Sequence, residues 1–377
     1  MGSITCEELS KLDSSEILLI DVRDSGSYEY GHISGAINVP FDSISDCNLP
    51  ENKKLVVYCR SGKTSREAVN RFVARGFDAC ELYGGYAQWM KYRISDMSGD
   101  TAAKVEEGLR KKFSKKLFSK FAKAIVEYKL IEPEDRIAVC ISGGKDSMLM
   151  AKLFQELKRH NKFPFELKFL VMDPGYSAEN RELIEANAKL LNIPVTIFET
   201  NIFENVFNIE KSPCYICARM RRGYLYSKAK ELGCNKIALG HHYDDVIETI
   251  LMGMLYGAQM QTMMPRVDSA NFEGMRLIRP MYLIRESDIA AWRDHYNLRF
   301  LQCACKFTEN NYSERYDNYS TGSKRKKVKE LISMLAKDDP EIEQNIFKSA
   351  ENVNLSTIIS YKDKEGKIHR YSDEDGN

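Results

Sequence analysis

Short apolar runs alternate with segments of helical periodicity in the first quarter of the chain. The runs EILLIDVR (16–23) and KLVVYCR (54–60) are rich in branched residues and are typical of buried strands. SREAVNRFVARG (65–76) has helical spacing and ends in a glycine, which commonly stops a helix. We therefore expect a small α/β domain over residues 1–95.

A second alternating series follows a polar stretch. SDMSGDTAA is mostly small and polar, and we expect a linker at 96–103. A basic amphipathic helix is expected from about 104 to 130. Beyond it, four buried parallel strands are predicted in RIAVCIS, LKFLVMD, PVTIFET and KIALG. Helices are expected to begin near Asp146, Ala178, Cys217 and Asp244.

This alternation predicts an α/β fold with a Rossmann-like parallel sheet in the second domain. Ligands are expected at the carboxyl ends of its strands. We assign residues 104–355 to this domain. Residues 356–377 are polar, and we expect a loosely ordered tail.

The length of 377 residues favours two domains, and 43% hydrophobic residues provide for ample cores. No apolar run approaches the roughly 20 residues of a membrane span. The first residues lack the build of a signal peptide. We therefore expect a cytoplasmic protein, in which the 10 cysteines serve as core residues, metal ligands or catalysts rather than in disulfides.

The net charge of +1 indicates no particular partner, but the basic residues gather in two runs. The first run contains Arg110, Lys111, Lys112, Lys115, Lys116, Lys120 and Lys123, and the second contains Lys324, Arg325, Lys326, Lys327 and Lys329. A basic run is commonly a solvated face. A patch that binds the phosphate backbone of a nucleic acid is the sharper alternative.

A first chemical site is predicted at Cys59, which follows a buried strand and precedes a helix. Amides at a helix N-terminus stabilise negative charge, and Arg60 and Lys63 add positive charge. Each feature favours a thiolate, which can carry an extra sulfur as a persulfide. The alternative is a partly buried cysteine beside a turn.

A second site is predicted at SGGKDS, where a strand gives way to a helix. Its residues are Ser142, Gly143, Gly144, Lys145, Asp146 and Ser147. The glycines let the backbone approach a phosphate, while hydroxyls, a cation and helix amides bind it. The pattern differs from the Walker sequence.

Polar residues also follow two later strands. Asp173 ends LKFLVMD and Gly240 ends KIALG, which is followed by His241, Asp244 and Asp245. Carboxylates at this edge could hold Mg²⁺ against phosphates. His241 is expected to contact the nucleotide. For the pair His241 and His242, a capping and packing role is the alternative.

Four cysteines raise the question of a metal centre. Cys214 and Cys217 form a CxxC pair, and Cys303 and Cys305 follow in FLQCACKF. Zinc with four ligands, an iron–sulfur cluster on three cysteines with one iron open, a redox dithiol and unliganded thiols are the alternatives. Spacing alone places zinc first.

Residues 1–95 resemble a single rhodanese domain. The resemblance is carried by Asp21, Arg23, Gly31, His32, Ile33, Gly35, Ala36, Pro40, the six-residue loop Cys59–Thr64 and LYGGYAQW. It implies sulfur transfer through a persulfide on Cys59. It does not identify the sulfur donor.

SGGKDS resembles the PP-loop of the N-type ATP pyrophosphatases, which cleave ATP to AMP and pyrophosphate and have an adenine nucleotide alpha hydrolase-like fold. Residues 104 to about 355 resemble the tRNA 2-thiocytidine synthetases of this class. The shared motifs are SGGKDS, CYICARMRRG, KIALGHHYDD, MLYG, IRPM and the later cysteines. The resemblance implies binding of ATP and Mg²⁺, with Asp173 contacting the nucleotide and Lys145, Asp146 and Asp245 acting in catalysis.

The same resemblance implies a [4Fe–4S] cluster on Cys214, Cys217 and a third cysteine. The family pattern there is Pro-Cys-x-x-Cys, whereas this chain has Gln302, Cys303, Ala304 and Cys305. We expect Cys303 as the third ligand, with Cys305 as the alternative or as a sulfur relay. The arginines after the CxxC pair, Arg219, Arg221 and Arg222, are then expected to face RNA.

The predicted reaction is adenylation of the C2 oxygen of a cytidine in the tRNA anticodon loop. Sulfur from Cys59, passed directly or through the cluster, then displaces AMP. The alternatives are thiolation of another nucleoside or small molecule, or a sulfur-carrier module whose PP-loop senses nucleotide. The expected partners are tRNA and a sulfur donor, either thiosulfate or a persulfide from a cysteine desulfurase. The sequence is compatible with a homodimer.

Overall fold

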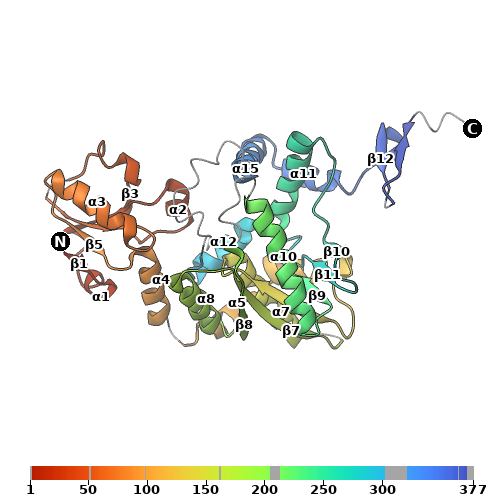
Figure 1. Cartoon of the computed structure of the whole chain (residues 1–377), viewed down its shortest axis with the longest axis horizontal. Coiled ribbons are helices and arrows are strands. Elements are labelled where there is room, and N and C mark those ends of the chain that lie inside the picture. Colours follow the sequence, from red (N-terminus) through yellow and green to blue (C-terminus); the bar gives the residue numbers. More distant parts are fainter. Residues whose placement is uncertain are drawn as a thin grey trace, which may run out of the picture. The chain divides into compact units, whose positions relative to one another are not determined.

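The computed structural model describes residues 2–50, 52–97, 99–160, 163–203, 213–301, 321–363 and 365–371, without the side chains of 213–215 and 321–323. They form two compact units (Figure 1). The first comprises the described residues up to His242 and again those from Pro265 to Leu301. The second comprises Tyr243–Met264 and the described residues from Thr321 onward.

A five-stranded parallel sheet forms the N-terminal domain, in the order β1-β5-β4-β2-β3. Its elements are β1 Ser3–Ile4, α1 Cys6–Leu9, β2 Ile17–Asp21, α2 Ser25–Tyr30, β3 Ile37–Asn38, β4 Lys54–Tyr58, α3 Lys63–Ala74, β5 Ala79–Leu82 and α4 Gly85–Asp96. Alternate residues of β4 face opposite sides of the sheet, as strand geometry requires. Leu55 and Val57 pack in the cluster that contains α3, and Val56 and Tyr58 in the one that contains α1 and α4.

A six-stranded sheet in the order β10-β11-β9-β6-β7-β8 follows, parallel except for β10. Its strands are β6 Arg136–Ile141, β7 Glu166–Asp173, β8 Val195–Glu199, β9 Lys236–Ala238, β10 Arg266–Asp268 and β11 Arg276–Ile278. Its helices are α7 Lys145–Arg159, α8 Ala178–Leu190, α10 Pro213–Glu231 and α12 Glu286–His295.

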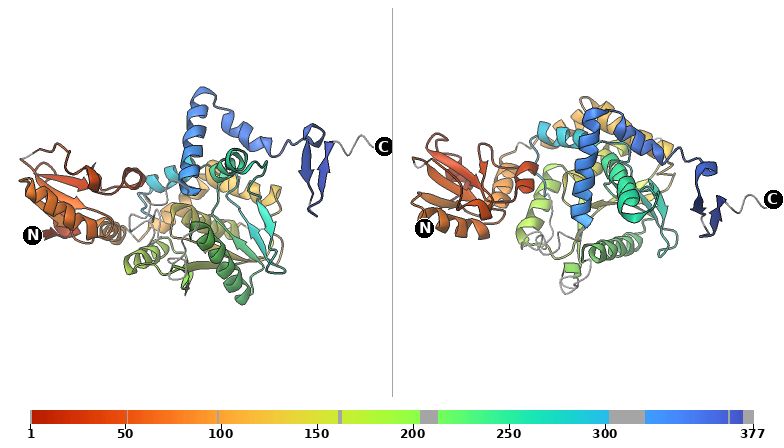
Figure 2. Two further views of the ribbon diagram at one scale, coloured as in Figure 1. Left: turned by 45° about the horizontal axis from the view of Figure 1, so that its top comes forward. Right: turned by 90° about the horizontal axis from the view of Figure 1, so that it is seen from above.

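Helices cover both faces of this sheet, which confirms the predicted architecture (Figure 2). Val139 and Ile141 of β6 pack in a cluster with α7, whereas Ala138 and Cys140 pack with α10. The prediction of a fully buried strand is wrong for β8, whose residues are only half-buried or exposed. The reason is its position at the sheet edge, where it has one neighbour.

The prediction of a single helix from 104 to 130 is wrong. The chain forms α5 Thr101–Arg110, a π-helical turn at Ser114–Phe118 and α6 Ser119–Glu127. Because α4 ends at Asp96 and α5 begins at Thr101, only four residues separate the helices of the two domains.

Many basic residues of this region have acidic partners. Lys111 pairs with Glu107 at 2.7 Å, and Lys116 and Lys120 both pair with Asp288, at 3.1 and 3.3 Å. The first basic run is therefore partly neutralised by the protein itself.

The second unit contains α11 Tyr243–Gly257, α15 Thr321–Asp338, α16 Ile342–Ser349, β12 Ser360–Lys362 and β13 Ile368–Arg370. The expectation of a loosely ordered tail is wrong for Ser360–Lys362 and Ile368–Arg370, because β12 and β13 pair as antiparallel strands. Among the described residues, no helix combines the length and the apolar character needed to cross a membrane.

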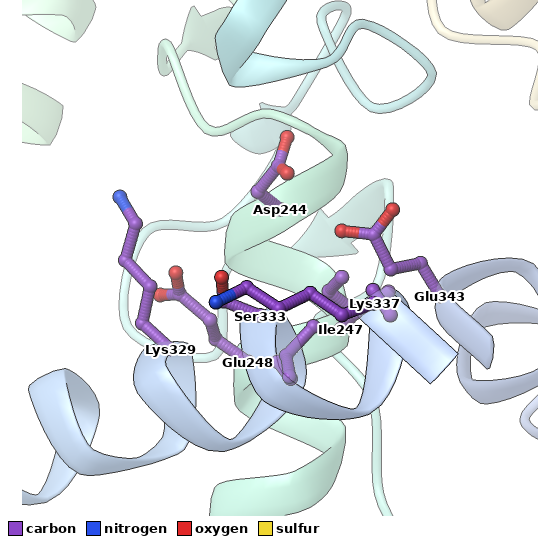
Figure 3. Close-up of a pocket in the computed structure, with 9 residues that line it drawn as sticks. Asp244, Ile247, Glu248, Lys329, Ser333, Lys337 and Glu343 are labelled. Atoms are coloured by element: carbon purple, nitrogen blue, oxygen red, sulfur yellow. The ribbon is translucent and has the colours of Figure 1, made fainter. Parts of the chain in front are cut away.

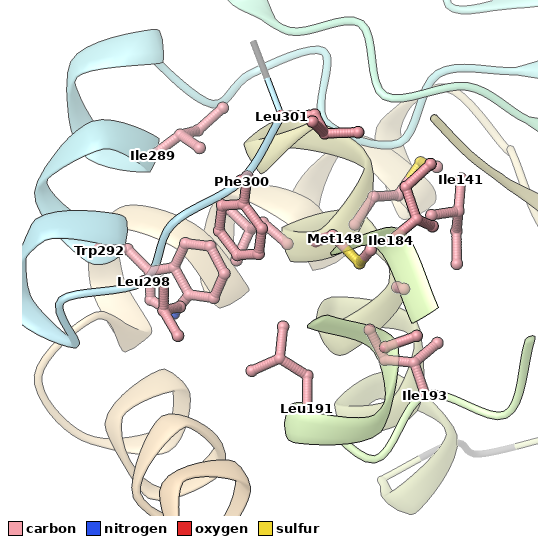
Figure 4. Packing of buried hydrophobic residues seen from close by; sticks show 14 of the residues in the cluster. Ile141, Met148, Ile184, Leu191, Ile193, Ile289, Trp292, Leu298, Phe300 and Leu301 are labelled. Atoms are coloured by element: carbon pink, nitrogen blue, oxygen red, sulfur yellow. The ribbon is translucent and has the colours of Figure 1, made fainter. Parts of the chain in front are cut away.

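One apolar cluster extends through both domains of the first unit. It includes Tyr86, Met90 and Ile94 from the N-terminal domain together with Ile141 and residues of α7 and α8. Figure 4 shows its C-terminal part, where the Trp292 and Phe300 rings stack at 5.9 Å. The two sheets therefore share a core within one unit.

Candidate functional site

The loop of residues 59–64, here called the carrier loop, surrounds the sulfur of Cys59 with polar groups. Cys59 is buried and follows β4 directly. The Gly62 N–H donates to Sγ at 3.2 Å, and the Ser65 hydroxyl oxygen lies 3.4 Å from Sγ. The Gly62 amide suits a sulfur that carries negative charge, and the Ser65 oxygen accepts from the Cys59 thiol.

The carrier loop is attached to the start of α4. Tyr86 N–H donates to the Cys59 carbonyl at 2.8 Å, and Ala87 N–H donates to that of Arg60 at 2.9 Å. Gly85 has φ +59°, and a Cβ there would lie 2.5 Å from the Cys59 carbonyl oxygen. Glycine is therefore required for this close approach.

The SGGKDS turn connects β6 to α7 as predicted. The Ser142 N–H donates to Ser147 Oγ at 3.1 Å, and Ser147 Oγ donates to the Gly144 carbonyl at 3.0 Å. Gly143 has φ +86°, and a Cβ there would lie 2.6 Å from Ile184. The turn thus presents amides and hydroxyls at the N-terminus of a 15-residue helix, which is an anion-binding arrangement.

Lys145 is buried beside two carboxylates. Its Nζ lies 3.1 Å from Asp146 Oδ1 and 3.0 Å from Glu286 Oε1. Burial opposes the charged form, but the negative charges of Asp146 and Glu286 outweigh it and raise the pKa of Lys145 to about 12. Lys145 therefore provides a permanent cation at the turn.

The loop after β9 approaches the same turn. A Cβ on Gly240 would lie 3.3 Å from the Ser147 nitrogen, so glycine allows the two segments to meet. His242 is buried, with Nε2 3.9 Å from Asp146 Oδ1. The structure therefore brings Gly240 and His242 to the SGGKDS turn. Nucleotide contacts by Gly240 and His241 stay predictions.

Asp173 ends β7, the strand beside β6. Its carboxylate accepts from the Gly175 and Tyr176 amides at 2.9 and 2.7 Å, and Arg181 lies 3.4 Å away. These contacts hold the loop that leads into α8. A nucleotide contact by Asp173 stays a prediction.

Cys217 lies in α10, buried among Met172, Ile202 and Phe203. One turn later, Arg221 donates to the Tyr176 hydroxyl at 3.1 Å, whereas Arg219 and Arg222 are exposed. Cys214 belongs to the same helix, with its side chain outside the described part. Cys303 and Cys305 lie outside the described residues.

Asp244 and Asp245 belong to the second unit. Asp245 pairs with Arg325 at 3.1 Å. Asp244 lines a pocket of about 380 Å³ together with Glu248, Lys329 and Glu343 (Figure 3). Part of the second basic run therefore faces acidic residues of α11. A Mg²⁺ role for the two aspartates stays a prediction.

Sequence reasoning missed two residues near these sites. Glu286 contacts Lys145 from α12, and Asn180 of α8 accepts a 3.4 Å hydrogen bond from Arg60. Glu286 is an acidic residue at a helix start, which by itself indicates favourable helix-end electrostatics. No motif distinguishes either residue, because each meets its partner only through the tertiary fold.

Two family models match the chain. The PP-loop domain matches residues 109–317, and the rhodanese-like domain matches residues 5–92. The sequence is similar to the tRNA-cytidine(32) 2-sulfurtransferase of Syntrophotalea carbinolica, with 35% identity over 240 residues, 63% of this chain and 88% of that protein.

The chain is also similar to a second sulfurtransferase and to a solved structure. The tRNA-cytidine(32) 2-sulfurtransferase 1 of Francisella philomiragia is 35% identical over 254 residues, 66% of this chain and 93% of that protein. The solved U34-tRNA thiolase NcsA of Methanococcus maripaludis with its [4Fe–4S] cluster has a TM-score of 0.48 and 20% identity, over 64% of this chain and 80% of that one.

Proposed function

The chain belongs to the PP-loop family of the tRNA-cytidine(32) 2-sulfurtransferases, and we propose that it uses ATP to replace the C2 oxygen of a tRNA cytidine by sulfur that its rhodanese-like domain carries. One observation supports this proposal above others. A phosphate-binding turn around Lys145 and a sulfur-carrier loop around Cys59 lie in one compact unit. The turn would activate the RNA with ATP, and the carrier loop would supply the sulfur.

ATP is proposed to bind at the SGGKDS turn. The amides of Gly143 and Gly144 and the hydroxyls of Ser142 and Ser147 face the phosphates, and Lys145 neutralises their charge. Asp244 and Asp245 are the candidate Mg²⁺ ligands, and Asp146 acts in catalysis. Asp173 and His241 contribute further nucleotide contacts.

The chemistry proceeds in two steps. The C2 oxygen of the cytidine attacks the α-phosphate of ATP, which gives an adenylated base and pyrophosphate. Sulfur then attacks C2, and the oxygen leaves as part of AMP. Adenylation is needed because an amide-like oxygen is a poor leaving group, whereas a phosphate ester departs readily.

We propose a [4Fe–4S] cluster on Cys214, Cys217 and either Cys303 or Cys305. The surroundings of Cys217 fit such a group, because Met172, Ile202 and Phe203 form an apolar wall of the kind that limits solvent access to a cluster. When bound, the cluster would supply an iron with an open position for a sulfur species. The role of α10 is to present its cysteines and the exposed Arg219 and Arg222 together.

The proposed partners are tRNA and a donor that loads Cys59, either thiosulfate or a persulfide from a cysteine desulfurase. The exposed arginines of α10 would bind the RNA backbone. A homodimer is compatible with these roles. Since the chemistry requires reduced thiols, we place it in the cytoplasm.

The test is nucleoside mass spectrometry of tRNA incubated with the protein, ATP, Mg²⁺, thiosulfate and a dithiol under anaerobic conditions. 2-Thiocytidine, AMP and pyrophosphate are expected, and ADP is not. Lys145→Ala should abolish the product. Lys158→Ala is the matched control, because Lys158 lies in the last turn of the same helix and donates to the Phe165 carbonyl at 2.9 Å.

Two results would redirect the proposal. A different thionucleoside in place of 2-thiocytidine would keep the chemistry and change the substrate. An equal rate of ATP cleavage with and without RNA would favour thiolation of a small molecule.

A further inference from the structure

We propose that the rhodanese-like domain docks on the PP-loop domain of its own chain and that Cys59 delivers sulfur in cis, with the Arg60–Asn180 contact holding the carrier loop at the edge of the PP-loop site. The inference rests on the proposed function, because it assumes that both sites serve one reaction. It adds the route of the sulfur and the surface that determines it.

The first contact joins the carrier loop to the loop that follows Asp173. Arg60 Nη2 donates to Asn180 Oδ1 at 3.4 Å, and Asn180 is buried. Asn180 lies in the first turn of α8, where its N–H bonds Ser177 Oγ. The segment from Asp173 to Asn180 therefore touches the end of β7 at one side and the residue after Cys59 at the other.

The second contact joins α4 to α8. Lys91 Nζ lies 2.5 Å from Glu182 Oε2. Because α4 is hydrogen-bonded to the carbonyls of Cys59 and Arg60, a contact that fixes α4 on α8 also fixes the carrier loop. Met90 and Ile94 of α4 are buried in the core shared by the two domains.

The third contact reaches the glycines of the SGGKDS turn. The Tyr30 hydroxyl donates to the Leu301 carbonyl at 3.4 Å, and the Arg293 guanidinium lies 5.3 Å from the centre of the Tyr30 ring. The Leu301 carbonyl oxygen lies 3.5 Å from where a Cβ on Gly144 would be. Tyr30 of the rhodanese-like domain thus contacts Leu301, and Leu301 lies beside Gly144 of the SGGKDS turn.

The connection between the domains limits the alternative of delivery to a second copy. The four residues between α4 and α5 span less than about 20 Å when fully extended. A partly exposed ion pair such as Lys91–Glu182 contributes little to stability by itself. The buried apolar residues of α4 therefore supply most of the docking energy, while the polar contacts set its geometry.

The transfer can be written with its electrons balanced. The terminal sulfur of the Cys59 persulfide forms a bond to C2 as the C2–O bond breaks and AMP leaves, which gives C2–S–S–Cys59. A dithiol reductant then cleaves this S–S bond. The dithiol reductant is oxidised to a disulfide, while C2 keeps the sulfur and Cys59 returns to a thiol.

Mixing two inactive full-length variants tests delivery in cis. Cys59→Ser cannot carry sulfur and Lys145→Ala cannot activate RNA, so an equimolar mixture should form no more 2-thiocytidine from thiosulfate than either variant alone. Recovery of a quarter or more of wild-type product would overturn delivery in cis. Inorganic sulfide supplied to Cys59→Ser should bypass the carrier and restore product. Failure of the wild type with sulfide would instead contradict the proposed function.

Charge reversal tests the docking surface. Glu182→Lys places two lysines together and should lower thiosulfate-driven product about two- to fivefold, consistent with an exposed pair, without changing sulfur loading of Cys59 or the sulfide-driven reaction. Lys91→Glu in the same chain should restore it. The hydrogen-exchange rates of α4 and α8 measure docking independently of enzyme turnover. Faster exchange in Asn180→Ala/Glu182→Lys supports the surface, and unchanged exchange overturns it.

Discussion

At the residue scale, Lys145 shows how neighbouring charges prepare a site. Its pKa is raised, so its charge stabilises the folded protein below the ordinary lysine pKa, and this contribution is lost only as the pH rises through about 12. Lys145 is therefore charged across the neutral range. Asp146 and Glu286 hold this charge but also compete with phosphate for it.

Neutralising Glu286 should consequently improve ATP binding. Glu286→Gln is expected to lower the KM for ATP about threefold or more, since one competing carboxylate is removed. Lys145→Ala should reduce AMP formation by about 100-fold or more. Glu67→Gln, which removes an exposed partner of Arg71, is the control. An unchanged or higher KM in Glu286→Gln would contradict this account of the pair.

Cys59 is expected to accept sulfur selectively among the thiols of its domain. Incubation with thiosulfate should add the mass of one sulfur atom to the wild type and to Cys47→Ser, but not to Cys59→Ser. Cys47 is a fair comparison because it is half-buried and lies 3.1 Å from Arg75, yet it is outside the carrier loop. Intact-protein mass spectrometry measures the outcome. Normal uptake by Cys59→Ser would exclude the carrier loop.

At the element scale, α10 combines an apolar side around Cys217 with exposed arginines. Arg221 differs from its neighbours because it is tied to Tyr176. The α5–α6 region is equally basic in sequence, but carboxylates offset much of its charge. The helix that carries the CxxC pair is therefore the better RNA surface.

Replacing Arg219 and Arg222 by alanine should weaken tRNA binding and flatten its salt dependence. The slope of log K against log salt should fall by about one per lost phosphate contact. Lys111→Ala/Lys123→Ala is the matched control, since both lysines are exposed and each is paired with a glutamate four residues away. Filter binding over a range of salt concentrations compares them. A larger effect of the lysine pair would move the RNA surface to α5–α6.

At the scale of the whole molecule, the sulfur-carrier site and the expected cluster site are chemically independent although their domains share a core. The hydrogen-bond partners of Cys59 come from Gly62 and Ser65, within its own loop and helix. Removal of a cluster cysteine on α10 therefore leaves those partners in place.

Cys214→Ala is expected to lose iron and sulfide while keeping thiosulfate loading of Cys59 at the wild-type rate. Metal analysis and absorbance of anaerobically purified protein measure the first effect, and mass spectrometry measures the second. Thermal unfolding provides the control for folding. Stoichiometric zinc in the wild type would instead favour a structural zinc site.

The sequence by itself determined the features that depend on neighbours along the chain. Apolar runs indicated β4, β6 and β7, and the two strand-to-helix turns around Cys59 and at SGGKDS were predicted where they occur. These features are local, because a strand followed by small residues and a helix start creates its own ring of amides. The shared motifs then indicated the family.

Only the tertiary structure decided which distant residues complete these sites. Glu286 reaches Lys145, Asn180 reaches Arg60, and Leu301 covers the SGGKDS glycines across long separations in sequence. In the tertiary structure the helix expected at 104–130 is interrupted by a π-helical turn, β8 is partly exposed at a sheet edge, and lysines pair with carboxylates. Burial and charge pairing depend on the whole packed chain, so no local pattern encodes them.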